Sequence, residues 1–333
     1  MTPSKPSTPS SACELTTSAE LRTTGRASRV SSVQQWQATG KYFEFARHRI
    51  FYQVEGAVES PVLILIHGYP SASWDWHFQW PTLVQHFRVI TLDMLGFGFS
   101  DKPRNLLKNS NVQYSIHTQA DIFSALLDYL GVTAVHILSH NYGDTVAQEL
   151  LARSLAKVNI TQRPSQQTIK VLSVCLLNGG LFPETHKALV LQKLLLSPIG
   201  SLIANLASHR KFKKNFDYIC TRNLPAEEIK ILWDLVNYNQ GKPILAKLIN
   251  YMRERKIFRE RWVGALQNSD VPICLIDGLA DPISGAHMVQ RYRELILNPD
   301  VVELEDVGHY PQLEAPDEVL KYFLKFYFEK VKI

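Results

Sequence analysis

The stretch that decides the fold is Val135-His136-Ile137-Leu138-Ser139-His140-Asn141-Tyr142-Gly143-Asp144. An apolar run, typical of a buried strand, ends in a small residue, passes Asn141 and meets a second small residue before a helix-like segment begins. Turns of this outline hold a nucleophile at the apex, above the edge of a sheet. The apex residue adopts a strained backbone with positive φ, which Asn accepts better than most residues. Asn141 is therefore either a structural turn residue or the occupant of a nucleophile position.

The same kind of apolar run recurs along the chain, which indicates strands that are buried on both faces. The expected strands are 61–67, 87–92, 135–139, 171–177, 273–277 and 301–304, preceded by a hairpin formed by 42–47 and 50–55. Amphipathic stretches between them, such as 116–130 and 142–153, predict helices. Strands that alternate with helices predict an α/β fold with a mostly parallel central sheet flanked by helices.

The alternation of strands and helices stops between residues 181 and 262, where the pattern is helical throughout. We therefore expect a helical lid inserted between two core strands. The resulting division assigns 36–180 and 263–333 to the core and 181–262 to the lid. Residues 1–35 are rich in Ser, Thr and Pro, a composition that favours a disordered tail.

Composition excludes several classes of function. The chain has 333 residues, of which 45% are hydrophobic and 20% charged, and its net charge is +5. It has no zinc-ligand spacing, nucleic-acid signature or Gly-rich phosphate loop, so we expect no metal, no cofactor and no nucleic-acid partner. The four cysteines are scattered, which favours a reducing, cytoplasmic location. No stretch is apolar enough over its length to predict a transmembrane helix.

Basic charge is concentrated in the predicted lid, which holds 15 Lys and Arg against 7 Asp and Glu. Its densest runs are His209-Arg210-Lys211-Phe212-Lys213-Lys214 and Arg253-Glu254-Arg255-Lys256. One interpretation of these runs is a solvated face, and the other is peripheral contact with an anionic membrane surface. The sequence leaves both interpretations open.

A second motif, His67-Gly68-Tyr69-Pro70, follows the first long apolar run. Glycine lets the chain turn tightly beside a ligand. When a sheet carries an apex turn of the kind described above, the loop at this position supplies one backbone N–H of an oxyanion hole, and the residue after the apex supplies another. We therefore expect the N–H groups of Tyr69 and Tyr142 to form an oxyanion hole.

Two further motifs follow the last two core strands. Asp281, in Gly278-Leu279-Ala280-Asp281-Pro282, can hydrogen-bond an imidazole and fix its tautomer. His309, in Val307-Gly308-His309-Tyr310-Pro311, is then the expected general base. The order of apex, acid and base along the chain is that of α/β-hydrolases, so we expect an α/β-hydrolase fold with Asn141, Asp281 and His309 in one site.

The chain resembles the epoxide hydrolase and haloalkane dehalogenase branch of α/β-hydrolases. The resemblance lies in His67-Gly68-Tyr69-Pro70, the segment 93–103, the turn at Asn141 and Gly308-His309-Tyr310-Pro311-Gln312-Leu313-Glu314. Within this branch the chain is similar to the mesoderm-specific transcript proteins of animals, in Asn178-Gly179-Gly180-Leu181-Phe182-Pro183-Glu184-Thr185-His186 and Arg261-Trp262-Val263-Gly264-Ala265-Leu266. The likeness covers about residues 36–328.

The resemblance implies a reaction with a covalent intermediate. In the branch, an apex Asp attacks an electrophilic carbon, and water activated by a His–Asp pair then hydrolyses the resulting ester. This chain departs from the branch at the apex, because Asn141 is neutral and its oxygen is a poor nucleophile. The resemblance also implies a lid tyrosine that donates a proton to an epoxide oxygen, for which Tyr218, Tyr238 and Tyr251 are the candidates.

The predicted ligand is a small apolar molecule. Trp74, Trp76 and Phe97 lie in or near the loops that follow two of the predicted strands, and they are candidates to line an apolar pocket, with core packing as the alternative. Relatives begin with an apolar anchoring segment, whereas the first residues of this sequence are polar. The resemblance therefore implies at most a peripheral association with the endoplasmic reticulum membrane.

Three functional hypotheses follow. The first is an active hydrolase, in which Asn141 becomes Asp by deamidation or His309 activates water directly. The second is a catalytically silent pocket that binds a small apolar ligand. The third is an interaction protein that acts through its basic lid.

Overall fold

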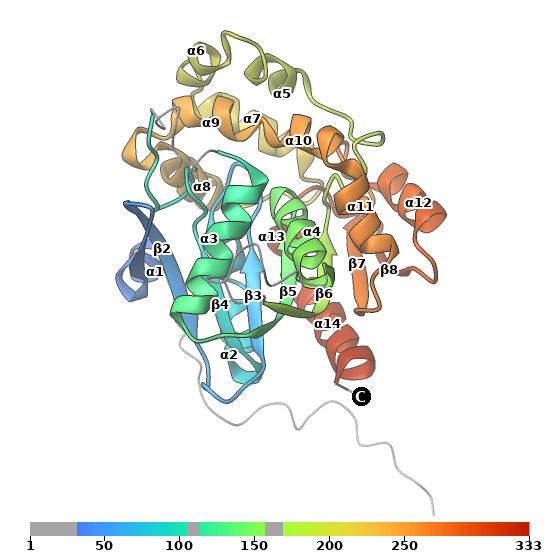
Figure 1. Ribbon diagram of the computed structural model, residues 1–333. Coiled ribbons are helices and arrows are strands. Elements are labelled where there is room, and N and C mark those ends of the chain that lie inside the picture. Colours follow the sequence, from blue (N-terminus) through green and yellow to red (C-terminus); the bar gives the residue numbers. More distant parts are fainter. Residues whose placement is uncertain (1–31, 105–113, 157–168, 333) are drawn as a thin grey trace, which may run out of the picture.

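An eight-stranded sheet forms the centre of the molecule in the computed structural model (Figure 1). The structure describes residues 32–104, 114–156 and 169–332, so most of the predicted tail lies outside the described residues. The strands are β1 (Lys41–Phe45), β2 (His48–Glu55), β3 (Val62–Ile66), β4 (Arg88–Leu92), β5 (Ala134–His140), β6 (Lys170–Leu177), β7 (Ile273–Gly278) and β8 (Asp300–Leu304).

The strand order across the sheet is β1-β2-β4-β3-β5-β6-β7-β8. The antiparallel pairs are β1 with β2 and β2 with β4, and the remaining pairs are parallel. The predicted hairpin is β1 and β2, joined by Ala46 and Arg47 with φ of 48° and 68°. Positive φ at both turn residues matches the right-handed twist of the two strands. The predicted α/β class with a mostly parallel sheet is confirmed.

Helices cover both faces of the sheet (Figure 1). Those of the core are α1 (Val33–Thr39), η1 (Ser73–Trp76), α2 (Trp80–His86), α3 (Ile116–Tyr129), α4 (Tyr142–Leu155), α11 (Arg259–Gln267), α12 (Ala286–Leu295), α13 (Pro311–Glu314), α14 (Pro316–Phe326) and η4 (Tyr327–Val331). Successive residues of a strand point to opposite faces. Ile64 and Ile66 of β3 accordingly belong to the apolar layer with α3 and α4, whereas Leu63 and Leu65 belong to the layer with α2 and α14.

The lid lies over the carboxyl ends of the parallel strands (Figure 1). Its helices are α5 (Val190–Leu195), α6 (Gly200–Asn205), α7 (His209–Ile219), α8 (Ala226–Asn237), η2 (Tyr238–Gln240), η3 (Lys242–Ile244), α9 (Leu245–Leu248) and α10 (Tyr251–Ile257). Loops at the carboxyl ends of parallel strands are where α/β proteins bind ligands, so the lid covers the place where a site is expected. Within the part of the chain that the structure describes, no helix has the length and apolar content needed to cross a membrane.

The predicted lid boundary at residue 262 falls inside α11, which packs against α4 of the core. Glu149 of α4 joins the two helices, because it accepts hydrogen bonds from Arg261 Nε over 2.7 Å and from Trp262 Nε1 over 2.8 Å. Burial alone would raise the pKa of Glu149, but His117, Arg261 and the other donors outweigh it and hold the pKa well below its ordinary value. This charged contact holds α11 against α4.

Candidate active site

A sharp turn between β5 and α4 places Asn141 at the carboxyl end of the sheet, with φ 54° and ψ −104°. Gly143 lets α4 approach β3 closely, because a Cβ at this position would lie 2.4 Å from the Ile66 carbonyl oxygen. The Ser139 hydroxyl donates to Asp144 Oδ1 over 2.6 Å and so joins the strand to the helix across the turn. The packed surroundings hold Asn141 in a backbone conformation that few residues other than glycine adopt.

Asn141, Asp281 and His309 converge in one buried cluster. His309 Nε2 lies 2.8 Å from Asn141 Nδ2, and His309 Nδ1 lies 2.6 Å from Asp281 Oδ2. The three residues are only 2–3% exposed. They meet because Asn141 follows β5, Asp281 follows β7 and His309 follows β8, and the carboxyl ends of these parallel strands lie at the same edge of the sheet.

Three donors besides His309 hold the Asp281 carboxylate. The Ile283 N–H donates to Oδ1 over 2.7 Å, and the Ser284 hydroxyl and the Asn178 amide donate to Oδ2 over 2.8 and 3.2 Å. Burial alone would raise the pKa of Asp281, but His309 and the first two donors outweigh it and hold the pKa below its ordinary value. An ionised Asp281 accepts the Nδ1–H of His309, which leaves Nε2 as an acceptor that faces Asn141.

The two expected oxyanion donors meet on the Asn141 side chain itself. Asn141 Oδ1 accepts from the Tyr69 N–H over 3.2 Å and from the Tyr142 N–H over 2.5 Å. Two N–H groups that converge on one oxygen stabilise the negative charge that develops when the attached carbon is attacked. The side-chain carbonyl of Asn141 therefore occupies the position that a reacting acyl group would take.

The carboxamide of Asn141 matches every hydrogen-bonding group around it. Its oxygen accepts from two N–H groups, and its nitrogen donates to the unprotonated Nε2 of His309. A carboxylate in its place would turn an oxygen acceptor toward Nε2, which is itself an acceptor. The two atoms could form a hydrogen bond only if the imidazole were protonated. The amide is a weak nucleophile, and it also engages the lone pair that a general base uses.

A buried cation lies directly behind the apex turn. Arg255 of α10 donates from Nη2 to the Asn141 backbone carbonyl over 2.9 Å and from Nε to Thr145 Oγ1 over 2.7 Å. Its guanidinium lies 4.5 Å from the centre of the Tyr251 ring, and no carboxylate within the described residues forms an ion pair with it. A positive charge in this position favours an anion at residue 141 over a neutral amide.

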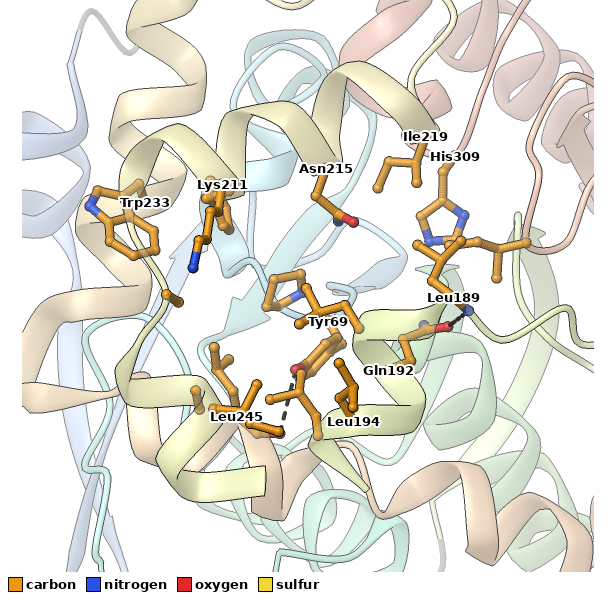
Figure 2. A pocket seen from close by; sticks show the side chains of 18 of the residues that line it. Tyr69, Leu189, Gln192, Leu194, Lys211, Asn215, Ile219, Trp233, Leu245 and His309 are labelled. Atoms are coloured by element: carbon orange, nitrogen blue, oxygen red, sulfur yellow. Dashed lines mark hydrogen bonds between the residues drawn. The ribbon is translucent and has the colours of Figure 1, made fainter. Parts of the chain in front are cut away.

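A cavity of about 300 Å³ extends from Asn141 and His309 into the lid (Figure 2). Its polar lining residues are Tyr69, Asn141, Gln192, Lys211, Asn215 and His309. Its apolar lining comes mostly from the lid: Leu189, Leu191, Leu194, Leu195, Ile203, Ala204, Leu206, Ala207, Phe212, Ile219, Trp233 and Leu245. An apolar wall with a few convergent polar groups suits a small apolar ligand.

The structure places the three core aromatic candidates outside this cavity. Trp74 is buried and stacks on His77 with ring centres 4.0 Å apart. Trp76 is fully buried, and Phe97 packs against the ring of Tyr142. Their positions in sequence are close to the site loops, but their side chains turn into the packing beneath those loops.

The three lid tyrosines also lie outside the cavity. Tyr218 is 65% exposed, because it precedes the cavity residue Ile219 on α7 and consecutive helical residues face different directions. Tyr238 packs against a phenylalanine of the core, and Tyr251 is fully buried against the ring that follows the apex. The tyrosine that does line the cavity is Tyr69.

Sequence reasoning missed Asn178 and the lid residues that form the cavity. Asn178 directly follows β6, and its position at the carboxyl edge of the sheet is a signal that could have identified it. The lid leucines carry no such signal, because an amphipathic pattern does not say what the apolar face of a helix meets. Among the described residues, no group of three or more His, Cys, Asp or Glu could hold a metal ion.

Comparison with known proteins finds relatives over most of the chain. The alpha/beta hydrolase fold family matches residues 61–316. The mesoderm-specific transcript homolog protein of Bos taurus is 42% identical over 308 residues, covering 89% of this chain and 88% of that protein. Epoxide hydrolase 3 of Xenopus tropicalis is 26% identical, covering 84% of this chain and 74% of that protein. A haloalkane dehalogenase variant from Bradyrhizobium elkanii aligns with a TM-score of 0.69 at 18% identity, covering 88% of this chain and 98% of that one.

Proposed function

The chain belongs to the α/β-hydrolase family and to its mesoderm-specific transcript group, and from that premise we propose that it is a hydrolase of the epoxide hydrolase-like branch acting on a small apolar substrate. The observation that supports this most is the position of the Asn141 side chain, with its oxygen between two N–H groups and its nitrogen 2.8 Å from His309 Nε2. Residue 141 is the nucleophile position, His309 activates water and Asp281 orients His309.

Asn141 lacks a nucleophilic oxygen, so the proposal includes a step that supplies one. Water that gives a proton to His309 adds to the side-chain carbon of Asn141, while the Tyr69 and Tyr142 N–H groups stabilise the oxygen. The C–N bond then breaks, and the proton passes from His309 Nε2 to the leaving nitrogen, which departs as ammonia. The product is Asp at position 141, and the positive charge of Arg255 favours this anion.

We expect wild-type protein at neutral pH to convert Asn141 to Asp with time, because His309 and the two N–H donors already surround the amide, and the Nε2 lone pair becomes available when its hydrogen bond to the amide nitrogen breaks. Mass spectrometry of the proteolytic peptide that contains residue 141 measures the fraction converted. In heavy-oxygen water the new carboxyl oxygen carries the label, which distinguishes this step from conversion before purification.

Two controls accompany this measurement. His309→Ala should stop the conversion, and the peptide that contains the exposed Asn268 reports ordinary spontaneous deamidation in the same sample. Conversion of Asn141 no faster than that of Asn268, or unaffected by His309→Ala, would contradict the proposed step.

A catalytically silent ligand-binding protein is the second candidate. The observation that favours it is that both ends of the Asn141 amide are hydrogen-bonded, the oxygen to two N–H groups and the nitrogen to His309 Nε2. An apolar ligand would then occupy the cavity of about 300 Å³ without turnover. A permanent amide at residue 141, together with ligand binding and no product, would support this candidate over the first.

The lid supports a third candidate, peripheral contact with an anionic membrane. Large apolar side chains on and around α5 and α6 are 44–72% exposed: Val190, Leu191, Leu194, Ile199, Leu202 and Leu206. The lid also holds 15 Lys and Arg against 7 Asp and Glu. Apolar side chains that insert and cations that attract anionic lipids are the two features of a helix that binds at a membrane surface.

We expect the protein to cosediment with vesicles that contain phosphatidylserine, more strongly at low salt than at high salt. Replacing Ile199 and Leu202 together with Asn should weaken this partition by on the order of tenfold or more, because both side chains lose their apolar transfer energy. Neither residue lines the cavity. Leu297→Asn is the matched control, since Leu297 is 86% exposed and lies on the surface of the α/β core, outside the lid. Equal binding by the double variant and the wild type would rule out this surface.

A further inference from the structure

Helix α7 runs along the cavity and connects its two ends. Lys211, Asn215 and Ile219 all line the cavity, and their spacing of four residues places them on one face of the helix. The Ile219 carbonyl accepts the His309 N–H over 2.9 Å, so this end of α7 adjoins the catalytic cluster. With a rise of about 1.5 Å per residue, Lys211 lies roughly 12 Å away along the helix.

Lys211 lines the cavity, and its ammonium group points toward the cavity from α7 (Figure 2). Within the described residues it has neither an ion pair nor a hydrogen-bond partner, although the neighbouring Lys213 forms an ion pair with Asp217 at 2.7 Å. Asn215 lies one turn nearer to His309 and also points toward the cavity (Figure 2). The cavity therefore presents a cation at its far end and an amide about midway along α7.

The wall opposite α7 is apolar. Leu194 and Leu245 line it from the side of the cavity that faces α7 (Figure 2), and Ile203 is also among the lining residues. An apolar chain that binds along this wall would gain free energy in proportion to the apolar surface that it removes from water. A charged end group at this end of the cavity would then pair with Lys211, an exposed cation that has no other side-chain partner among the described residues.

We propose that the cavity selects an apolar chain with an anionic end group, carboxylate or phosphate, which pairs with Lys211. The remainder of the chain lies along α7 toward Asn141 and His309. This inference rests on the proposed function in one respect: the cavity is the substrate cavity. It adds the class of substrate and makes Lys211 the residue that determines it.

The test compares decanoate with decanol, which share a chain and differ in the end group. Calorimetric titration of the full chain should show decanoate bound roughly tenfold more tightly than decanol, as a charge-assisted contact predicts. Lys211→Met should remove this preference and leave decanol binding unchanged, and Lys211→Arg should keep the preference. A third titration, with decyl phosphate, shows which of the two anions the site prefers.

Lys214→Met is the matched control, because Lys214 is an exposed lysine of the same helix that does not line the cavity. It should bind decanoate as the wild type does. Decanol and decanoate bound equally by the wild type, or decanoate weakened equally by both lysine variants, would overturn the anion site and leave the proposed function standing. Failure of the wild type to bind either compound would overturn both.

Discussion

Asn141→Asp should hydrolyse a small epoxide, alkyl halide or ester on the order of 10⁴-fold faster than wild-type chain whose residue 141 is still an amide. Asp has nearly the shape of Asn, so the Tyr69 and Tyr142 N–H groups can hold one carboxylate oxygen while the other attacks. Arg255, which donates to the backbone carbonyl of residue 141 over 2.9 Å, supplies a positive charge beside the new anion. The measurement is kcat/KM of purified variant and wild type on one substrate of each class.

Asn215→Asp is the control for this substitution. It places the same carboxylate in the same cavity but away from the apex turn, and it should give no gain in rate. Mass analysis of the wild-type peptide must show the unconverted amide, since any converted fraction adds activity to the reference. An Asn141→Asp protein that is folded and inert toward all three substrate classes would show that the assignment to this branch fails in function, although the fold stands.

His309→Ala, introduced into the Asn141→Asp chain, should reduce steady-state turnover on the order of 10⁴-fold. The covalent step needs only the carboxylate, whereas hydrolysis of the ester needs an activated water. His140 is the nearest other imidazole, but its Nε2–H donates to the His309 carbonyl over 2.7 Å and burial holds its pKa well below the ordinary value. It therefore cannot take over as the base. A brief burst followed by arrest is the expected time course.

The exposed His86 provides the control, and His86→Ala should turn over as the parent does. Thermal unfolding of the His309→Ala chain shows whether the fold survives, because removal of a buried imidazole also leaves Asp281 without its partner. Turnover that continues at the parent rate in a folded His309→Ala chain would assign the activation of water to another residue.

The strands could be predicted because a parallel sheet covered on both faces requires continuous apolar runs. The run 61–67 became β3 (Val62–Ile66), and 135–139 became β5 (Ala134–His140). The predicted end of the lid at residue 262 falls inside α11 for a different reason. The helical pattern continues from the lid into α11 without a break, and only tertiary packing against α4 makes α11 part of the core.

The catalytic candidates could be located because their positions follow from topology. The turn and loops that follow β5, β7 and β8 must meet at one edge of a parallel sheet, and Asn141, Asp281 and His309 are chemistry-bearing residues there. Topology could not predict which way the side-chain amide of Asn141 is oriented in its hydrogen bonds. Only the coordinates show that the Asn141 nitrogen faces Nε2 while its oxygen faces two N–H groups.

The cavity lining could not be predicted, and the reason is geometric. Large aromatic side chains near the site loops, such as Trp76 and Phe97, are buried in the packing below them. The residues that line the cavity come instead mostly from the lid helices, and the orientation of those helices depends on how the inserted segment packs on the core. Lys211 lines the cavity, whereas Lys213 forms an ion pair with Asp217 outside it, only because of that orientation.

The mass of the residue-141 peptide from a protein that carries both Asn141→Asp and His309→Ala, after exposure to bromobutane, tests the nucleophile position most directly. We predict one butyl group on this peptide, attached as an ester at residue 141 and released by mild base, because attack proceeds and hydrolysis is blocked. The same exposure of the His309→Ala single variant, which keeps Asn141, should leave the peptide unmodified. A butyl group found on another residue, or no adduct on the residue-141 peptide of the folded double variant, would contradict the assignment of residue 141 as the nucleophile position.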